Sequence, residues 1–380
     1  MTEGKRFSRD ILVNLAALLV ILVILFFVMV RAQTLVVPMI LAIFFALMLE
    51  PLVARFTRVF GNKIMAIVLA LFLSSLLIAL VLVGFSYQVA NTFQDRTGLE
   101  TQLRQGVRDF TNRVYDLADR LGGVNRDTVD EWIREIGEAV MAFLGDGLAS
   151  TPAFALGAGI CLICTFFFLF YQKGFKNFII LQFSEGSKDT VIETMSRIKM
   201  VAQQYLRGLG SVMLIMAVVN SLGLWIIGVG YPILWGCLAA FLTIIPFVGT
   251  TIGGLLPFLY SAATSDSLWQ PIAVVIFYAT IQQIEGNLIT PKVIGNSVSL
   301  NSITAFLAIL IGGFAWGIAG IILAIPIVAV LRTIFSEINP LKPVALLMSK
   351  ELESHTSDFK GRYDRPKYRL SRLVKRTKGK

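Results

Sequence analysis

The residues with the clearest potential for chemistry lie together in one apolar stretch. Glu285 is the only charged residue between Asp266 and Lys292, and long uncharged runs flank this interval. Its polar and helix-breaking neighbours are Gln282, Gln283, Asn287 and Pro291, of which Pro291 is expected to end a helix. A carboxylate is costly to place at membrane depth and is rarely kept there without a partner or a use. Loss of water favours its protonated form, so Glu285 is a candidate for binding and releasing a proton.

Two other interpretations of Glu285 stay open on the sequence. Together with the neighbouring amide groups, Glu285 could ligate a sodium ion. It could instead lie at the membrane edge, in water or paired with Lys292, and take no part in transport. Asn220 is a further polar residue within an apolar run and a candidate for a hydrogen bond between helices.

A second set of candidate residues interrupts the uncharged run from Gly208 to Ser265. These residues are Pro246, Gly249, Thr250, Gly253 and Pro257. Proline breaks helices, and backbone that leaves a helix at membrane depth is tolerated only inside protein or along a cavity. Carbonyls and hydroxyls at this break could therefore face a solute. The spacing of Gly249 and Gly253 equally fits the GxxxG pattern of closely packed helices.

A similar glycine-rich string lies near the end of the apolar region. Its members are Gly313, Gly317, Gly320 and Pro326. Close packing is the favoured interpretation of Gly313 and Gly317, whose spacing is again GxxxG. The string as a whole predicts a second broken or re-entrant segment.

The sequence argues against an enzyme and against a metal or cofactor site. It contains no P-loop, HExxH, GxSxG or kinase motif, so the chain itself is not expected to hydrolyse ATP. The only histidine is His355. Cys161 and Cys164 form a CxxC inside an apolar run, and we expect them and Cys237 to be packing residues.

The composition is that of a polytopic membrane protein. Hydrophobic residues make up 56% of the chain and charged residues 15%, whereas soluble domains have about 25% charged residues. Several runs reach the length of about 20 helical residues that crosses a bilayer core. We predict an all-α fold with about eight transmembrane helices. The first apolar run lacks a small-residue cleavage site and is expected to be a retained span and not a signal peptide.

Polar segments divide the chain into four predicted parts. Residues 1–90 hold spans one to three, and residues 150–335 form a transport core with broken or re-entrant segments. Between them, residues 91–149 have apolar residues at steps of three and four around a Gly-Gly turn, which predicts an extramembrane helical hairpin. This hairpin is interpreted as a gate or docking module, or as a structural cap or oligomer contact. Residues 336–380 form a basic tail.

Within the core, an amphipathic helix at about residues 185–206 is expected to lie on the cytoplasmic membrane surface, with Arg207 and Gly208 as interfacial residues where the next span begins. All the short basic segments fall on one side of an eight-span arrangement, which places both termini in the cytoplasm. The tail is interpreted as disordered or as an anchor to anionic lipid. No nucleic-acid partner is expected.

Four ordered motifs resemble the autoinducer-2 exporter family, whose members are also called PerM-like permeases. A YLRG entry to a span corresponds to Tyr205–Gly208. A glycine-proline break is matched by Ile245, Pro246, Gly249, Ile252, Gly253 and Pro257. A QxxExNxxxP segment is matched by Gln282, Glu285, Asn287 and Pro291. A closing GxxxGxxGxxLAxP string is matched by Gly313, Gly317, Gly320, Leu323, Ala324 and Pro326.

This resemblance covers nearly the whole chain and implies a carrier of the bacterial inner membrane, expected to be a homo-oligomer. Members are described as exporters of small signalling molecules or as sodium/proton antiporters. The chain departs from the family pattern at Ser299 and Ser302, which replace a glycine and a proline, and at Leu209, where glutamine is common.

The leading hypothesis is secondary transport of a small polar solute, such as a signalling molecule like autoinducer-2, with Glu285 as a coupling or gating site. One alternative is a sodium/proton antiporter that uses Glu285 directly. Another is a membrane scaffold or assembly partner that acts through the 91–149 hairpin and the basic tail.

Overall fold

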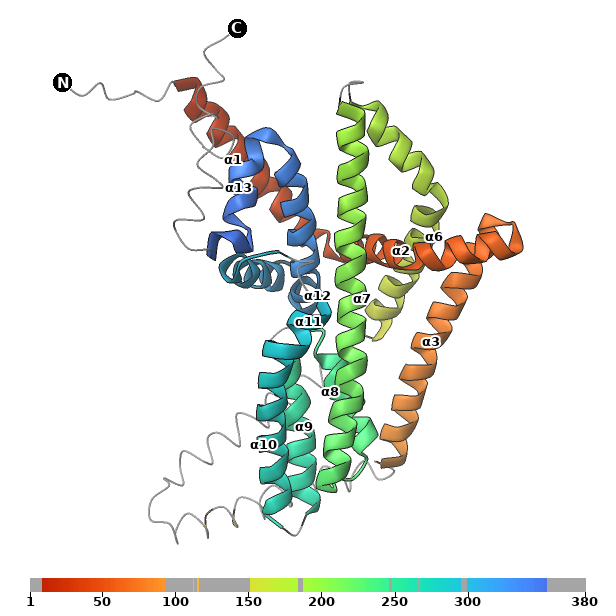
Figure 1. Ribbon diagram of the computed structural model, residues 1–380, viewed down its shortest axis with the longest axis vertical. Helices are drawn as coiled ribbons and strands as arrows, with labels where there is room; N and C mark the ends of the chain where they lie inside the picture. Colours follow the sequence, from red (N-terminus) through yellow and green to blue (C-terminus); the bar gives the residue numbers. More distant parts are fainter. Residues whose placement is uncertain are drawn as a thin grey trace, which may run out of the picture. The chain divides into compact units, whose positions relative to one another are not determined.

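The computed structural model of the chain is helical in almost all of the part that it describes (Figure 1). That part comprises residues 9–92, 112, 115, 151–183, 187–245, 248–265, 267–294 and 299–353. Within it there is no strand, and a single isolated β-bridge pairs Leu300 with Ser349. The predicted all-α class is confirmed. The predicted 91–149 hairpin and the tail beyond Glu353 lie outside the described residues, apart from positions 91, 92, 112 and 115.

Six helices in the described part are long and apolar enough to cross a membrane. The segments with these properties are Gln33–Phe60, Lys63–Leu80, Ala155–Leu181, Lys188–Ile227, Trp269–Val293 and Ser302–Glu337. The helices that contain them are α2 (Gln33–Phe60), α3 (Lys63–Thr92), α6 (Thr151–Leu181), α7 (Lys188–Ile227), α10 (Trp269–Ile284) with its continuation α11 (Thr290–Ile294), and α12 (Ser302–Glu337). Before them, helix α1 (Arg9–Arg31) takes up the first apolar run.

The break predicted in the uncharged run from Gly208 to Ser265 is present in the structure. The segment from Ile233 to Tyr260 is divided between α8 (Pro232–Leu242), which has 11 residues, and α9 (Val248–Thr264), which has 17. Each is shorter than the length of about 20 residues that crosses a bilayer. The break between them includes the turn at Thr243–Ile245, and Pro246 lies outside the described residues. The two short helices pack against each other as a hairpin.

The described residues fall into two compact units. The first takes its residues from Met1–Pro51, Gly157–Tyr205 and Asn296–Lys380, and the second takes its residues from Leu52–Leu156 and Leu206–Gly295. Helices α2 and α7 each contribute one part to either unit.

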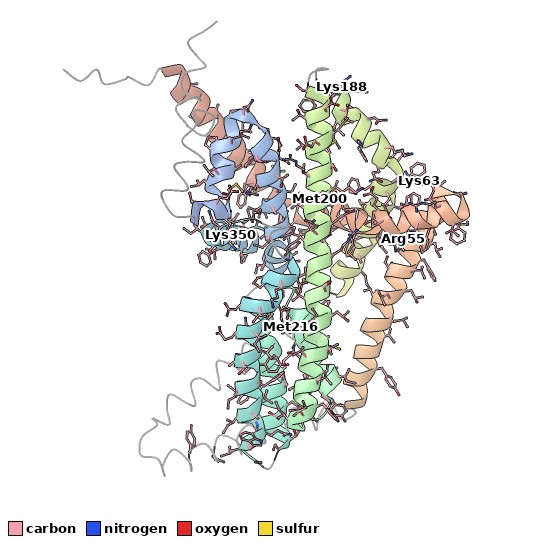
Figure 2. The ribbon with its side chains drawn as sticks, in the orientation of Figure 1. Arg55, Lys63, Lys188, Met200, Met216 and Lys350 are labelled. Carbon is pink, nitrogen blue, oxygen red and sulfur yellow. The ribbon has the colours of Figure 1, made fainter. Side chains whose placement is uncertain are left out.

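Helix α7 runs for 40 residues without a break through Gly208. Figure 2 labels Lys188, Met200 and Met216 along it. A helix boundary at Arg207 and Gly208, expected from the change in polarity there, is therefore absent. The placement of residues 185–206 on a membrane surface stays a prediction.

Polar contacts hold the first half of α7 within the first unit. Arg197 forms ion pairs with Glu193 at 2.7 Å and with Glu337 on α12 at 2.8 Å. Lys199 forms an ion pair with Glu50 on α2 at 2.5 Å. One turn further on, the amide of Gln203 donates to the carbonyl of Leu47 at 2.7 Å.

Helix α12 contains a sharp bend, although it is continuous in sequence. Trp316 and Gly317 leave the helical conformation, and Gly317 has φ +58° and ψ −137°. The two arms come so close that a Cβ at Gly320 would lie 1.8 Å from the carbonyl oxygen of Gly312. The indole of Trp316 donates at 3.0 Å to the carbonyl of Met29, one of the last residues of α1. Helix α12 is thus a helical hairpin, which agrees with the broken segment predicted there.

In the second unit, α9 packs against both α8 and α10 (Figure 1). Gly228, with φ +84°, ends α7 because its positive φ is the conformation that closes a helix C-terminus. The amide of Gln270 at the start of α10 donates to the carbonyl of Gly228 at 2.7 Å. Pro232 begins α8, as a residue with a fixed φ and no N–H donor suits the first helical turn.

Asn301 joins the start of α12 to the segment that follows this helix. Its side chain accepts from the backbone N–H of Thr304 at 2.8 Å and donates to the carbonyls of Leu347 and Ser349 at 2.6 and 3.3 Å. The residue is 4% exposed. It therefore caps the helix and holds the Lys342–Leu347 helix, α13, with one side chain.

Replacing Asn301 with Ala is expected to destabilise this junction by about 2–4 kcal/mol, because a helix cap is lost together with the donor to buried carbonyls. Trypsin cleavage after Lys350, followed by mass spectrometry, should become several-fold faster. Asn62→Ala is the control, since Asn62 caps α3 at an exposed site by accepting from Ile64 N and Met65 N; a cost of about 1 kcal/mol is expected there. Equal cleavage of Asn301→Ala and the unmodified protein would contradict the role of Asn301.

Candidate functional site

Glu285 lies where the regular helix of α10 gives way to a π-helical turn. The turn, η2, covers Glu285–Ile289 and leads directly into α11. The N–H of Thr290 bonds to the carbonyl of Glu285, which is the five-residue step that defines a π turn. Such turns inside α-helices are rare and are frequent at functional sites.

Pro291 does not end the helix, contrary to the prediction. It is the second residue of α11, which continues to Ile294. A proline inside a helix removes an N–H donor and crowds the carbonyl four residues earlier, here that of Asn287. The wider π turn immediately before Pro291 accommodates this change in hydrogen bonding without ending the helix.

The carboxyl group of Glu285 is half-buried and has one neutral partner. The hydroxyl of Thr290 donates to its Oε1 at 3.1 Å. No ion pair joins Glu285 to Lys292 among the residues described, and Lys292 is exposed. Pairing with Lys292, one of the interpretations left open by the sequence, is therefore absent.

The amide side chains around Glu285 have different environments. Asn287 is exposed, and its Nδ2 donates to the carbonyl of Gln283 at 2.9 Å and to Oε1 of Gln283 at 3.3 Å. The Oε1 of Gln282, in contrast, is buried without a hydrogen-bond partner within the described structure. The sequence identified all three amides as candidates. Among them, Gln282 is the one whose buried oxygen has no hydrogen-bond partner in the described structure.

The glycines of the α8–α9 hairpin are positions of close helix packing. A Cβ at Gly249 would lie 1.8 Å from the carbonyl oxygen of Leu242, and a Cβ at Gly253 would lie 2.8 Å from Cα of Ala239. Pro257 is buried inside α9, and Thr250 belongs to the first turn of the same helix. The packing interpretation thus has direct geometric support, whereas a solute contact at this break stays a prediction.

The glycine string of α12 has a similar packing role within its own unit. Gly313 and Gly320 face the opposite arm of the bent helix, and Gly317 forms the bend itself. Pro326 is buried in the second arm. Sequence reasoning missed Gly312, whose carbonyl receives the closest approach from Gly320. The two adjacent glycines, Gly312 and Gly313, could have indicated in the sequence that this part of the helix packs closely against another segment.

Arg207 and Gly208 lie in the interior of α7. Arg207 is exposed, Gly208 is buried, and the carbonyl of Arg207 accepts from the hydroxyl of Ser211 at 2.9 Å. No group of three or more His, Cys, Asp or Glu residues that could hold a metal ion occurs among the described residues.

Several polar residues lie in the interior of the second unit, and sequence reasoning missed two of them, Ser221 and Tyr278. Asn220, expected to bond between helices, is 1% exposed, but its Oδ1 has no partner in the described part of the chain. The same holds for the buried hydroxyl oxygens of Ser221 and Tyr278. Tyr278 carried no sequence signal, because a tyrosine in an apolar helix usually serves as a packing residue.

Comparison with known proteins gives one consistent family. The model of the family described as AI-2E family transporter matches residues 15–339. YhhT of Escherichia coli (strain K12), provisionally named a transport protein, is 26% identical over 87% of this chain and 91% of its own length. The AI-2 transport protein TqsA of the same organism is 23% identical over 84% of this chain and 90% of its own length. YrrI of Bacillus subtilis (strain 168), also provisionally named a transport protein, is 37% identical over 34% of this chain and 36% of its own length.

Proposed function

The chain belongs to the AI-2E family of transporters and is a multi-pass membrane protein. We propose that it is a secondary transporter of a small polar solute in the bacterial inner membrane. The observation that carries the proposal is Glu285, a half-buried carboxyl group at a π turn inside a candidate membrane span, which accepts a hydrogen bond from the neutral hydroxyl of Thr290. Such a group can change its charge without breaking an ion pair. We assign it the role of coupling or gating site.

The relative TqsA supplies the first solute to test, since its name describes the transport of AI-2. A small signalling molecule of this kind fits a carrier whose described interior has neutral polar groups and few charges. We also propose, from the basic segments, that both termini are cytoplasmic and that the tail binds anionic lipid. A homo-oligomeric assembly is part of the same proposal.

Reconstitution of the purified full-length protein tests the proposed transport. Proteoliposomes with imposed proton or sodium gradients should accumulate AI-2 above the level of protein-free vesicles. Sodium/proton exchange that needs no solute would instead make the protein an antiporter. Movement of neither solute nor ions would contradict transport and favour a scaffold role.

A further inference from the structure

The described part of the second unit contains two apolar clusters that are separated along the helices. The first, the Trp235 cluster, contains Leu224, Val229, Leu234, Trp235 and Val274. The second, the Met216 cluster, contains Val212, Met216, Ala240 and Ile281. Helix α7 contributes Met216 to one cluster and Leu224 to the other, so Asn220, one turn from each, faces the level between them. On α10, Tyr278 packs against the Trp235 cluster and precedes Ile281 of the Met216 cluster.

Four residues of α7 and α10 that lie beside these clusters carry polar atoms without partners, and we call this set the polar layer. It consists of Asn220 and Ser221 on α7 and Tyr278 and Gln282 on α10. Each contributes a buried oxygen atom that has no hydrogen-bond partner among the described residues. Buried polar groups are nearly always paired, and an unpaired one destabilises the folded state. Buried water molecules commonly satisfy such groups, and each bonds to about three of them.

The helices approach one another closely around the polar layer. A Cβ at Gly236 of α8 would lie 2.3 Å from the hydroxyl oxygen of Ser221, and a Cβ at Gly254 of α9 would lie 2.8 Å from the ring of Tyr278. Helices in such close contact favour an occupant as small as a water molecule over a larger solute.

The polar layer continues along α10 to Glu285. Tyr278, Gln282 and Glu285 are spaced by four and three residues, which places them on one face at intervals of about one 5.4 Å turn. A water molecule can bridge groups at this separation. Three charged residues, Arg207, Glu285 and Lys292, lie in the helices described around the polar layer. These helices are the second-unit part of α7, α8, α9, α10, η2 and α11. The titratable side chains there also include Cys237 and the tyrosines Tyr231, Tyr260 and Tyr278.

We propose that the polar layer holds ordered water and serves as a relay that carries protons from bulk water through the interior of the second unit to Glu285. Each water molecule accepts one proton and releases another, and the last proton binds to the carboxylate of Glu285, which becomes neutral. Tyr278 and Gln282 position the water molecules along α10, and Asn220 and Ser221 position them from α7. This inference rests on the proposed coupling role of Glu285 and adds the route by which its proton arrives.

Radiolytic hydroxyl labelling tests for the water independently of any transport. Radicals formed from an ordered water molecule modify a buried side chain next to it, so Tyr278 should be labelled in the full-length protein. Tyr260 is the matched control, because it is a tyrosine of the same unit that is partly exposed, as Tyr278 is, and it lies outside the polar layer. Asn220→Leu should reduce the labelling of Tyr278 several-fold. Labelling of Tyr278 no stronger than that of Tyr260, or unchanged in Asn220→Leu, would overturn the relay, whatever role Glu285 has.

Proton flux into proteoliposomes, followed by a pH-sensitive dye, tests the relay itself. Tyr278→Phe removes one oxygen atom and should slow proton flux about tenfold, whereas Tyr260→Phe, the matched change on α9, should not alter it. Retained flux in Tyr278→Phe together with lost flux in Glu285→Gln would overturn the relay and leave the coupling role of Glu285 intact. Flux that survives in Glu285→Gln as well would overturn both.

Discussion

Glu285→Gln is expected to reduce gradient-driven solute accumulation in proteoliposomes to the level of protein-free vesicles. The substitution preserves the size of the side chain and an oxygen that can accept from the hydroxyl of Thr290. It removes the ability to bind and release a proton or to carry a negative charge. The change should therefore eliminate coupling while the protein still elutes as the same species in detergent and unfolds at nearly the same temperature.

Two further glutamate variants complete this experiment. Glu285→Asp keeps a titratable carboxyl group but withdraws it by one methylene, so partial accumulation with a changed dependence on pH is expected. Glu193→Gln is the matched control, because Glu193 is an exposed partner of Arg197. Its loss should leave accumulation unchanged, as exposed ion pairs contribute about 0–1 kcal/mol. Full, normally coupled accumulation in Glu285→Gln would contradict the coupling role.

The fold class could be predicted because apolar runs of this length have few alternatives. A backbone at membrane depth must satisfy its hydrogen bonds internally, so long uncharged runs become helices. The run from Ile233 to Tyr260 was harder, since its apolar character is continuous while its backbone is not. Glycine and proline indicated a break, but the sequence alone could not determine that α8 and α9 pack against each other as a hairpin.

Near Arg207, in contrast, the sequence predicted a boundary that the structure lacks. A polar segment followed by an apolar one predicts a boundary, yet α7 continues through it because no residue there disfavours a helix strongly enough. Similarly, Pro291 is a strong helix breaker by type, but the π turn that precedes it absorbs the missing donor.

The candidate site was predictable in its centre and not in its surroundings. Glu285 could be found by its charge alone, because an isolated carboxylate stands out in an apolar run. Tyr278 and Ser221 could not, since their importance depends on being buried without a partner, and that property arises only when helices distant in sequence pack together.

The bend of α12 gives the second large effect, because two of its glycines are required for different reasons. At Gly320, a Cβ would lie 1.8 Å from the carbonyl oxygen of Gly312, far inside van der Waals contact. Gly320→Ala must therefore push the two arms of the hairpin apart, at a cost of about 1–3 kcal/mol or more. At Gly317, there is open space, but φ is +58° with ψ −137°, a region that residues with a Cβ avoid. Gly317→Ala is expected to cost about 1–3 kcal/mol through backbone strain alone.

Thermal unfolding of the detergent-solubilised protein can separate these two causes. Gly159→Ala is the control in α6 of the same unit, where a Cβ would meet nothing within 4 Å. It should leave stability unchanged or raise it by about 0.4–1 kcal/mol, because alanine restricts the unfolded chain. Enlarging the side chain from Ala to Val should lower the melting temperature much further at Gly320, where the obstacle is space. At Gly317 the same enlargement should add less, since strain begins with the first Cβ. Equal melting temperatures for Gly320→Ala, Gly320→Val and Gly159→Ala would show that the two arms of α12 do not meet at glycine.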